Sequence, residues 1–84
     1  MRFDVLLHEL RLFKSRSQAA AAIADGFALL DGAAVKPSRE ARAGQRITLI
    51  GDKTSRMLEI LELPHGSVSK EKAKELVKEV SGAG

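Results

Sequence analysis

Basic and hydroxyl side chains gather in one short segment near the start of the chain, and together they are suited to binding anions. The side chains are Arg11, Lys14, Ser15, Arg16 and Ser17. Ser15 begins a capping-box pattern with Gln18, which predicts the first turn of a helix. The amides of such a turn have no partner within the helix and attract phosphate groups. The segment therefore predicts a phosphate-binding site flanked by three cations.

Further basic side chains downstream extend this candidate surface. They are Lys36 and Arg39, with Arg42 and Arg46 as weaker candidates. Residues 1–50 hold eight Lys or Arg against five Asp or Glu, whereas residues 51–84 hold six of each sign, so the net charge of +3 lies in the first part. Most of these cations are Arg, whose planar fork suits phosphates and base edges. The charge pattern favours a nucleic-acid partner.

Two helices are predicted to position these side chains. The first has an apolar stripe with spacings of three and four, which predicts a helix over residues 3–13. A second, Ala-rich helix follows Ser15, and Gly26 is placed to adopt left-handed backbone just past its end. Because alanines bury little apolar area, Ile23 and Phe27 are the expected anchors of this helix.

The rest of the chain predicts a small sheet and one more helix. Asp31-Gly32 is a strong signal for a type I′ hairpin turn. Strands are expected at residues 27–30, 33–35, 46–50 and 57–63. A helix is expected over residues 70–80, with an apolar stripe that covers one face of the sheet, and residues 81–84 are expected to fray. This order predicts an α+β fold, in which two N-terminal helices precede a small, mainly antiparallel sheet and a C-terminal helix.

Composition and motifs exclude several kinds of site. The absence of cysteine excludes disulfides and thiolate zinc sites. No apolar run is long enough to cross a bilayer, and charges interrupt the N-terminal apolar stretch where a secretory signal would have none. His8 and His65 fit neither a zinc motif nor a catalytic triad. We expect a cytoplasmic, monomeric protein that is not an enzyme and has no cofactor, metal, membrane or small-molecule substrate.

The aromatic content bears on the kind of nucleic acid. The chain has no Trp or Tyr, and its three Phe are expected in the core, so no platform for stacking single-stranded bases is predicted. Structured RNA, which proteins read largely through backbone shape, is therefore favoured. A DNA-binding helix-turn-helix remains an alternative, although a hairpin rather than a third helix follows the helix pair. A protein-interaction module that docks through residues 70–80 is the other alternative.

These residues resemble the S-four RNA-binding domain, also called the alpha-L motif. The resemblance covers residues 2–50 and rests on LRLFKSRS at 10–17, Ala19, Ile23, Gly26, Asp31-Gly32, VKPS at 35–38, Gly44 and Ile47. In that family two helices and a hairpin bind structured RNA, often ribosomal or transfer RNA. The runs RLFKSRS and VKPS are most similar to the small ribosome-associated heat-shock proteins, which bind the large ribosomal subunit.

The resemblance implies specific roles for the basic segment. Arg11, Lys14 and Arg16 match the family's basic positions, and the implied partner is large-subunit rRNA or tRNA in ribosome quality control or assembly. We expect residues 1–50 to form the alpha-L motif and residues 51–84 to complete the same domain. The family usually has Asn-Gly at the hairpin turn, so Asp31 adds a negative charge near the expected RNA face.

Overall fold

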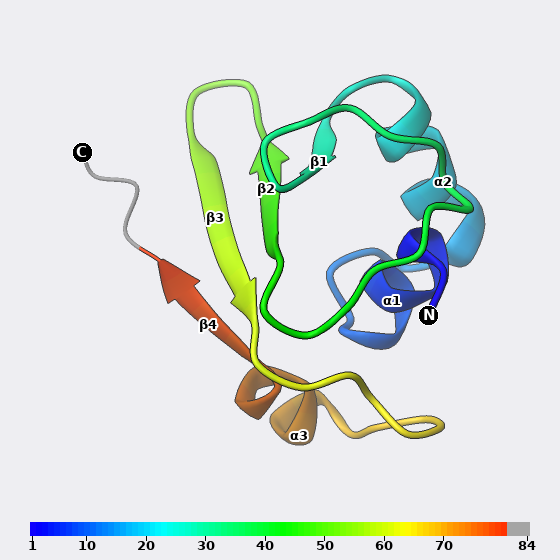
Figure 1. The fold of residues 1–84 in the computed structure, drawn as a ribbon, viewed down its shortest axis with the longest axis vertical. Coiled ribbons are helices and arrows are strands. Elements are labelled where there is room, and N and C mark those ends of the chain that lie inside the picture. Colours follow the sequence, from blue (N-terminus) through cyan, green and yellow to red (C-terminus); the bar gives the residue numbers. More distant parts are fainter. Residues whose placement is uncertain (81–84) are drawn as a thin grey trace.

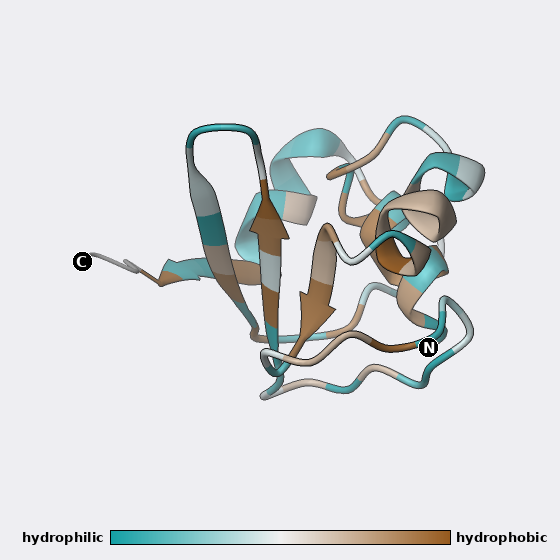
Figure 2. Cartoon of the chain, turned by 90° about the horizontal axis from the view of Figure 1, so that it is seen from above, coloured by the Kyte–Doolittle hydropathy of each residue, from teal (hydrophilic) through white to brown (hydrophobic). Residues whose placement is uncertain are grey.

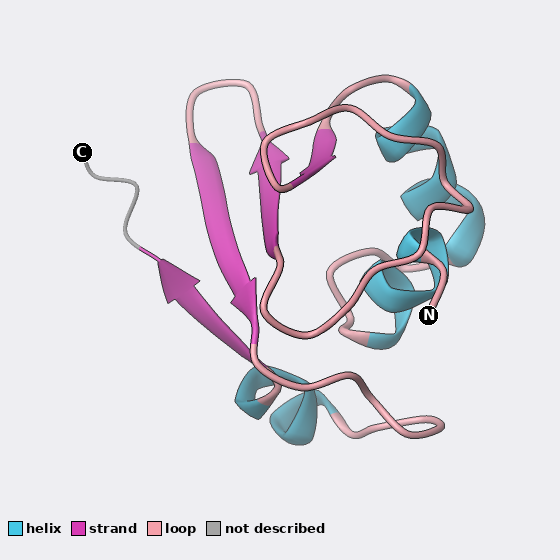
Figure 3. Cartoon of the chain, in the orientation of Figure 1, coloured by secondary structure: helices cyan, strands magenta, loops and turns pink. Residues whose placement is uncertain are grey.

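The computed structural model describes residues 1–80 and combines three helices with a four-stranded sheet (Figures 1 and 3). The elements are α1 (Phe3–Glu9), α2 (Arg16–Ala24), β1 (Ala28–Leu30), β2 (Arg46–Ile50), β3 (Ser55–Ile60), α3 (Lys70–Glu75) and β4 (Val77–Val80). The strand order is β1-β2-β3-β4, and all neighbouring strands are antiparallel. The predicted fold class is confirmed. The expected fraying of residues 81–84 lies outside the described residues.

The core lies between the helix pair and the sheet. α1 and α2 pack together beside β1, and α3 lies at the end of the sheet where β3 ends and β4 begins (Figure 1). β1 and β2 are largely hydrophobic, whereas α3 is largely hydrophilic (Figure 2). The core consists of Phe3, Leu6, Leu7, Leu10, Ala19, Ile23, Ala28, Leu30, Ala41, Ile47, Leu58, Ile60 and Leu76.

The first helix is shorter than predicted because Arg11 ends it. Arg11 has left-handed backbone, with a φ of 61°. Its N–H donates to the carbonyl of His8, and the N–H of Leu12 donates to the carbonyl of Leu7. This is the Schellman arrangement, which normally uses glycine at the left-handed position. The expectation of a helix over residues 3–13 is therefore wrong beyond Glu9.

The second helix has the predicted ends and one of its two predicted anchors, Ile23, which is 1% exposed. The Ser15 hydroxyl accepts a hydrogen bond from the Gln18 N–H at 3.1 Å, and Gly26 has a φ of 83°. Phe27 is 55% exposed, so its expected place in the core is wrong. Side chains alternate along an extended segment, and Ala28 is directed into the core, which leaves Phe27 outside.

The predicted hairpin turn is confirmed, but the strand predicted at residues 33–35 is wrong. Asp31 and Gly32 both have positive φ, as a type I′ turn requires. Beyond this turn only an isolated bridge joins Leu30 to Ala33. The chain then runs beside α1, where the carbonyls of Pro37 and Arg39 accept from the N–H groups of Asp4 and Phe3. These bonds satisfy donors that the first turn of α1 cannot pair internally.

The C-terminal part differs most from the prediction. Strand β2 has the expected bounds, and β3 lies two residues earlier at its start and three at its end. The helix expected over residues 70–80 ends at Glu75, and β4 pairs with β3 instead. Without β4, β3 would be an exposed sheet edge, and the β-branched Val77 and Val80 suit a strand. Residues 77–80 thus extend the sheet rather than cover its face.

Candidate nucleic-acid interface

A buried carboxylate organises the basic side chains at the start of α1. Asp4 is only 2% exposed. Its carboxylate accepts hydrogen bonds from Arg2 Nη2 at 3.0 Å and from the N–H of Val5 at 2.7 Å. Arg16 Nε, from the first turn of α2, lies 3.6 Å from the same carboxylate. Asp4 therefore contacts an arginine from each of two segments, where the first turn of α1 lies beside the first turn of α2.

The pKa of Asp4 is below its ordinary value. Burial by itself raises this pKa, but the hydrogen bonds from Arg2 and Val5 and the charges of Arg2 and Arg16 together lower it by more. The ionised carboxylate is therefore the stable form at neutral pH. Its charge is largely compensated by the two guanidinium groups.

This lowered pKa predicts a pH dependence of stability. A carboxyl whose folded pKa is depressed stabilises the fold above its unfolded pKa, and this contribution is lost as the pH falls through the folded value. We expect Asp4→Asn to be less stable than the wild type at pH 7, with the difference shrinking below about pH 4. Urea unfolding of both proteins between pH 7 and pH 2 measures this. A difference that does not change with pH would contradict the ion-pair role.

Two of the downstream cations lie in a loop that packs against the same first turn of α1. The hydrogen bonds from Phe3 and Asp4 to residues 37 and 39 hold the loop that carries Lys36 and Arg39 against the first turn of α1. The side chains of both residues are exposed. We call Arg2, Arg16, Lys36 and Arg39 the α1-start basic group. Glu40 lies next to this group, and its carboxylate pairs with the terminal ammonium of Met1 at 2.6 Å.

Arg11 and Lys14 lie at the other end of α1. They line an open hollow of about 520 Å³ together with His8, Leu12, Phe13 and Lys70. Arg11 also donates two hydrogen bonds to the carbonyl of Val68, from Nε at 3.2 Å and Nη2 at 2.9 Å. The predicted cations of residues 11–16 are thus divided between the two ends of α1.

The remaining predicted residues have different surroundings. The Ser15 hydroxyl is used as the cap of α2, whereas Ser17 is exposed on its first turn. Arg42 is also exposed, and its N–H donates to the side chain of Gln45 at 2.8 Å. Since Gly44 nearby bonds to Ile60, this part of the loop is held by the sheet rather than by the helix pair.

Sequence reasoning missed Arg2 and Lys70. Arg2 stands two residues before Asp4, so its pairing had a local signal. Lys70 lies in a charge-balanced segment and meets Arg11 and Lys14 only through the fold. No spacing along the chain indicated that these three side chains would line one hollow.

Asp31 serves the hairpin rather than standing free. Its carboxylate accepts from the Arg46 N–H and from Gln45 Nε2, both at 2.9 Å. The hydrogen bond from Arg46 and the one from Gln45 lower the pKa of Asp31. The negative charge expected near the RNA face is therefore engaged with the start of β2.

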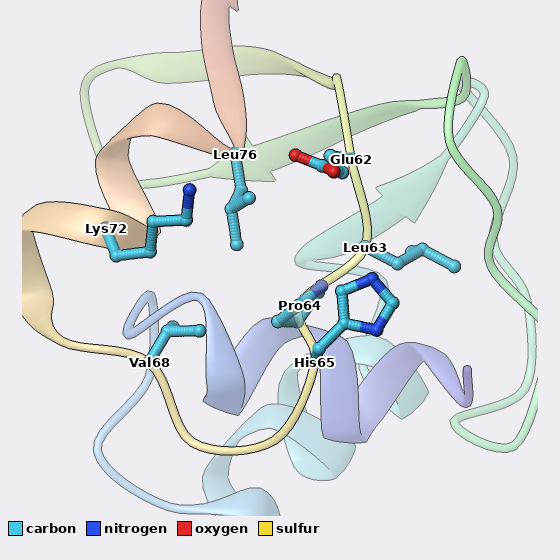
Figure 4. Close-up of a pocket in the computed structure, with 7 residues that line it drawn as sticks. All are labelled: Glu62, Leu63, Pro64, His65, Val68, Lys72 and Leu76. Atoms are coloured by element: carbon cyan, nitrogen blue, oxygen red, sulfur yellow. The ribbon is translucent and has the colours of Figure 1, made fainter.

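A smaller hollow of about 150 Å³ is lined by residues of both signs. Leu76, Val68 and Pro64 face one another across it, and Glu62, Lys72 and His65 lie at its rim (Figure 4). Among residues 1–80, no three His, Cys, Asp or Glu side chains are grouped as a metal site would need. In that same range no helix has the length and apolar character to span a membrane.

Comparison with known proteins decides the family. The S4 domain profile matches residues 1–47, more than half of the chain. The chain belongs to the S4 domain family. The resemblance found in residues 2–50 is thus confirmed, and this S4 domain is an RNA-binding domain.

One solved structure extends the likeness to the C-terminal part. The trimeric structure of heat shock protein 15 from Vibrio cholerae superposes with a TM-score of 0.89 at 26% sequence identity. The match covers 96% of this chain and 82% of that one. A search of curated protein sequences finds no match. The similarity of this S4 domain protein to a heat shock protein agrees with the resemblance seen in its sequence.

Proposed function

We propose that this S4 domain protein binds structured RNA without catalysing a reaction, and that its partner is large-subunit rRNA or tRNA. The observation that carries the proposal is the α1-start basic group: Arg2 and Arg16 contact the buried Asp4 carboxylate, and the loop that carries Lys36 and Arg39 is bonded through its backbone to the same turn of α1. Arg11, Lys14 and the first turn of α2, with Ser15 and Ser17, continue the contact surface beyond this group. Arg42 is a peripheral member.

The geometry suits the RNA backbone. Two arginines are held in place by Asp4, so less side-chain freedom is lost when they bind phosphate. If about four to six phosphates are neutralised, the slope of log affinity against log salt is on the order of −4 to −5, by analogy with duplex DNA. The protein should bind a hairpin RNA more tightly than duplex DNA of equal length. A DNA-binding helix-turn-helix would show the opposite preference.

Neutralising Lys36 and Arg39 together tests the proposed face. The carbonyls of Pro37 and Arg39, not the side chains of Lys36 and Arg39, bond to α1, so Lys36→Gln/Arg39→Gln should stay folded. We expect affinity for a hairpin RNA to fall on the order of tenfold and the salt slope to become shallower by about 1 to 2. The control, Lys53→Gln/Lys72→Gln, removes the same charge from the β2–β3 loop and from α3, outside the proposed face. Equal effects in both variants would refute the proposed face.

The partner is tested by sedimentation with ribosomal particles from a lysate at low and moderate salt. If the wild type co-migrates with the large subunit and Lys36→Gln/Arg39→Gln does not, a role in ribosome quality control or assembly is supported. Binding to isolated structured RNA without co-migration would point to tRNA or another small RNA. The same gradients report the oligomeric state, for which we expect a monomer.

A further inference from the structure

Two neighbouring hollows lie where the end of α1 meets the C-terminal part of the chain. The larger, described above, has Arg11, Lys14, Lys70 and His8 in its lining. The second, of about 170 Å³, is lined by Leu10, Arg11, Leu12, Arg56, Lys70, Lys74 and Val77. Arg11, Leu12 and Lys70 border both. Of the described residues that line the two hollows, none is an Asp or Glu.

The net charge of residues 51–84 is zero, so the charge count along the chain does not indicate this basic surface. Lys70 and Lys74 are four residues apart on α3, so they share one helix face, which borders the second hollow. Glu71 and Glu75 share a different face, since they are each one residue further along. α3 therefore directs Lys70 and Lys74 toward the end of α1, whereas Lys72 borders the smaller mixed-charge hollow. Arg56 contributes less, because it pairs with Glu79 at 3.0 Å.

Arg11 fixes this arrangement across the fold. Its two hydrogen bonds to the Val68 carbonyl hold the segment just before α3 against the end of α1. They use two of the five N–H groups of the guanidinium, which leaves the others for a ligand. Arg11 also keeps a left-handed backbone that side chains rarely adopt. A strained arginine in that position is consistent with a positioning role for its side chain.

We propose that the C-terminal part of the chain supplies a second phosphate-binding surface for the same RNA. This α1–α3 basic surface consists of Arg11, Lys14, Lys70 and Lys74. The inference rests on the proposed function and extends it, because half of the surface lies outside the residues that match the S4 domain family. Lysines act as point charges toward phosphate and read no sequence, so this surface should strengthen binding to any RNA long enough to reach it.

The test compares two doubly neutralised variants of the full chain on a hairpin RNA with a single-stranded extension. Lys70→Gln/Lys74→Gln removes the α3 half of the surface. Lys53→Gln/Lys72→Gln removes the same charge elsewhere, since Lys72 borders the smaller mixed-charge hollow and Lys53 lies in the β2–β3 loop. We expect the first variant to bind on the order of tenfold more weakly, with a salt slope shallower by about 1 to 2, and the control to change little.

The two proposals fail in distinguishable ways. If Lys36→Gln/Arg39→Gln weakens binding while the α3 variant behaves like its control, the second surface is refuted and the proposed function stands. If the wild type binds no structured RNA, both are refuted. Thermal unfolding of each variant shows whether a change in affinity reflects the surface or the fold.

Discussion

Replacing Arg16 with glutamate is expected to weaken RNA binding on the order of 10- to 100-fold, as loss of a charge-assisted hydrogen bond and its reversal imply. The structure also predicts a loss of stability, because the new carboxylate would lie beside the buried carboxylate of Asp4. The free energy of unfolding should fall by about 1 to 2 kcal/mol, less than for a fully buried pair because the Arg16 side chain is 54% exposed.

Two further variants separate the loss of an RNA contact from the loss of stability. Arg16→Gln removes the cation without adding a like charge, so its affinity should fall while its stability changes little. Adding Asp4→Asn to Arg16→Glu should recover part of the stability but not the affinity. Affinity measured by fluorescence anisotropy and stability measured by urea unfolding give both quantities. Wild-type affinity in a folded Arg16→Gln protein would remove Arg16 from the proposed interface.

Truncating Leu76 to alanine is expected to cost about 2 to 5 kcal/mol of unfolding free energy, because Leu76 is only 2% exposed and its removal leaves a cavity. Its carbonyl also accepts from the N–H groups of Leu61 and Glu62, so it lies where the end of β3 meets α3. A loss of this size would support the proposal that residues 51–84 complete one domain with residues 1–50. A cooperative unfolding transition with a lowered midpoint is the expected observation.

Leu61 offers a matched control for this variant. It is 48% exposed and lies in the same region, so Leu61→Ala should cost far less than Leu76→Ala. Similar small losses in both variants would mean that the C-terminal part contributes little to folding. That result would favour residues 70–80 as a docking segment for a protein partner.

Local signals predicted the second helix and the tight turns well, whereas the first helix ends four residues earlier than its apolar stripe indicated. Ser15 caps α2, as the spacing of Ser15 and Gln18 predicted. Gly26, Asp31 and Gly32 adopt the positive φ that their residue types favour. Strand β2 has the predicted bounds, since its alternating apolar residues lie between clear turn signals. These features depend on residues that are near one another in the sequence, so the sequence by itself determined them. It also determined the family, because the residues that carry the S4 resemblance are the ones that build this local structure.

The tertiary structure alone decided the features that depend on distant partners. Residues 77–80 form a strand because β3 offers a free edge, although their pattern also fits a helix. Phe27 lies outside because its neighbour Ala28 fills the core position. The same holds for function, since Asp4 brings Arg2 and Arg16 together and Arg11 brings Lys70 to the end of α1. Charge counted along the chain cannot show such convergence, because it depends on which side chains the fold brings within a few ångströms of one another.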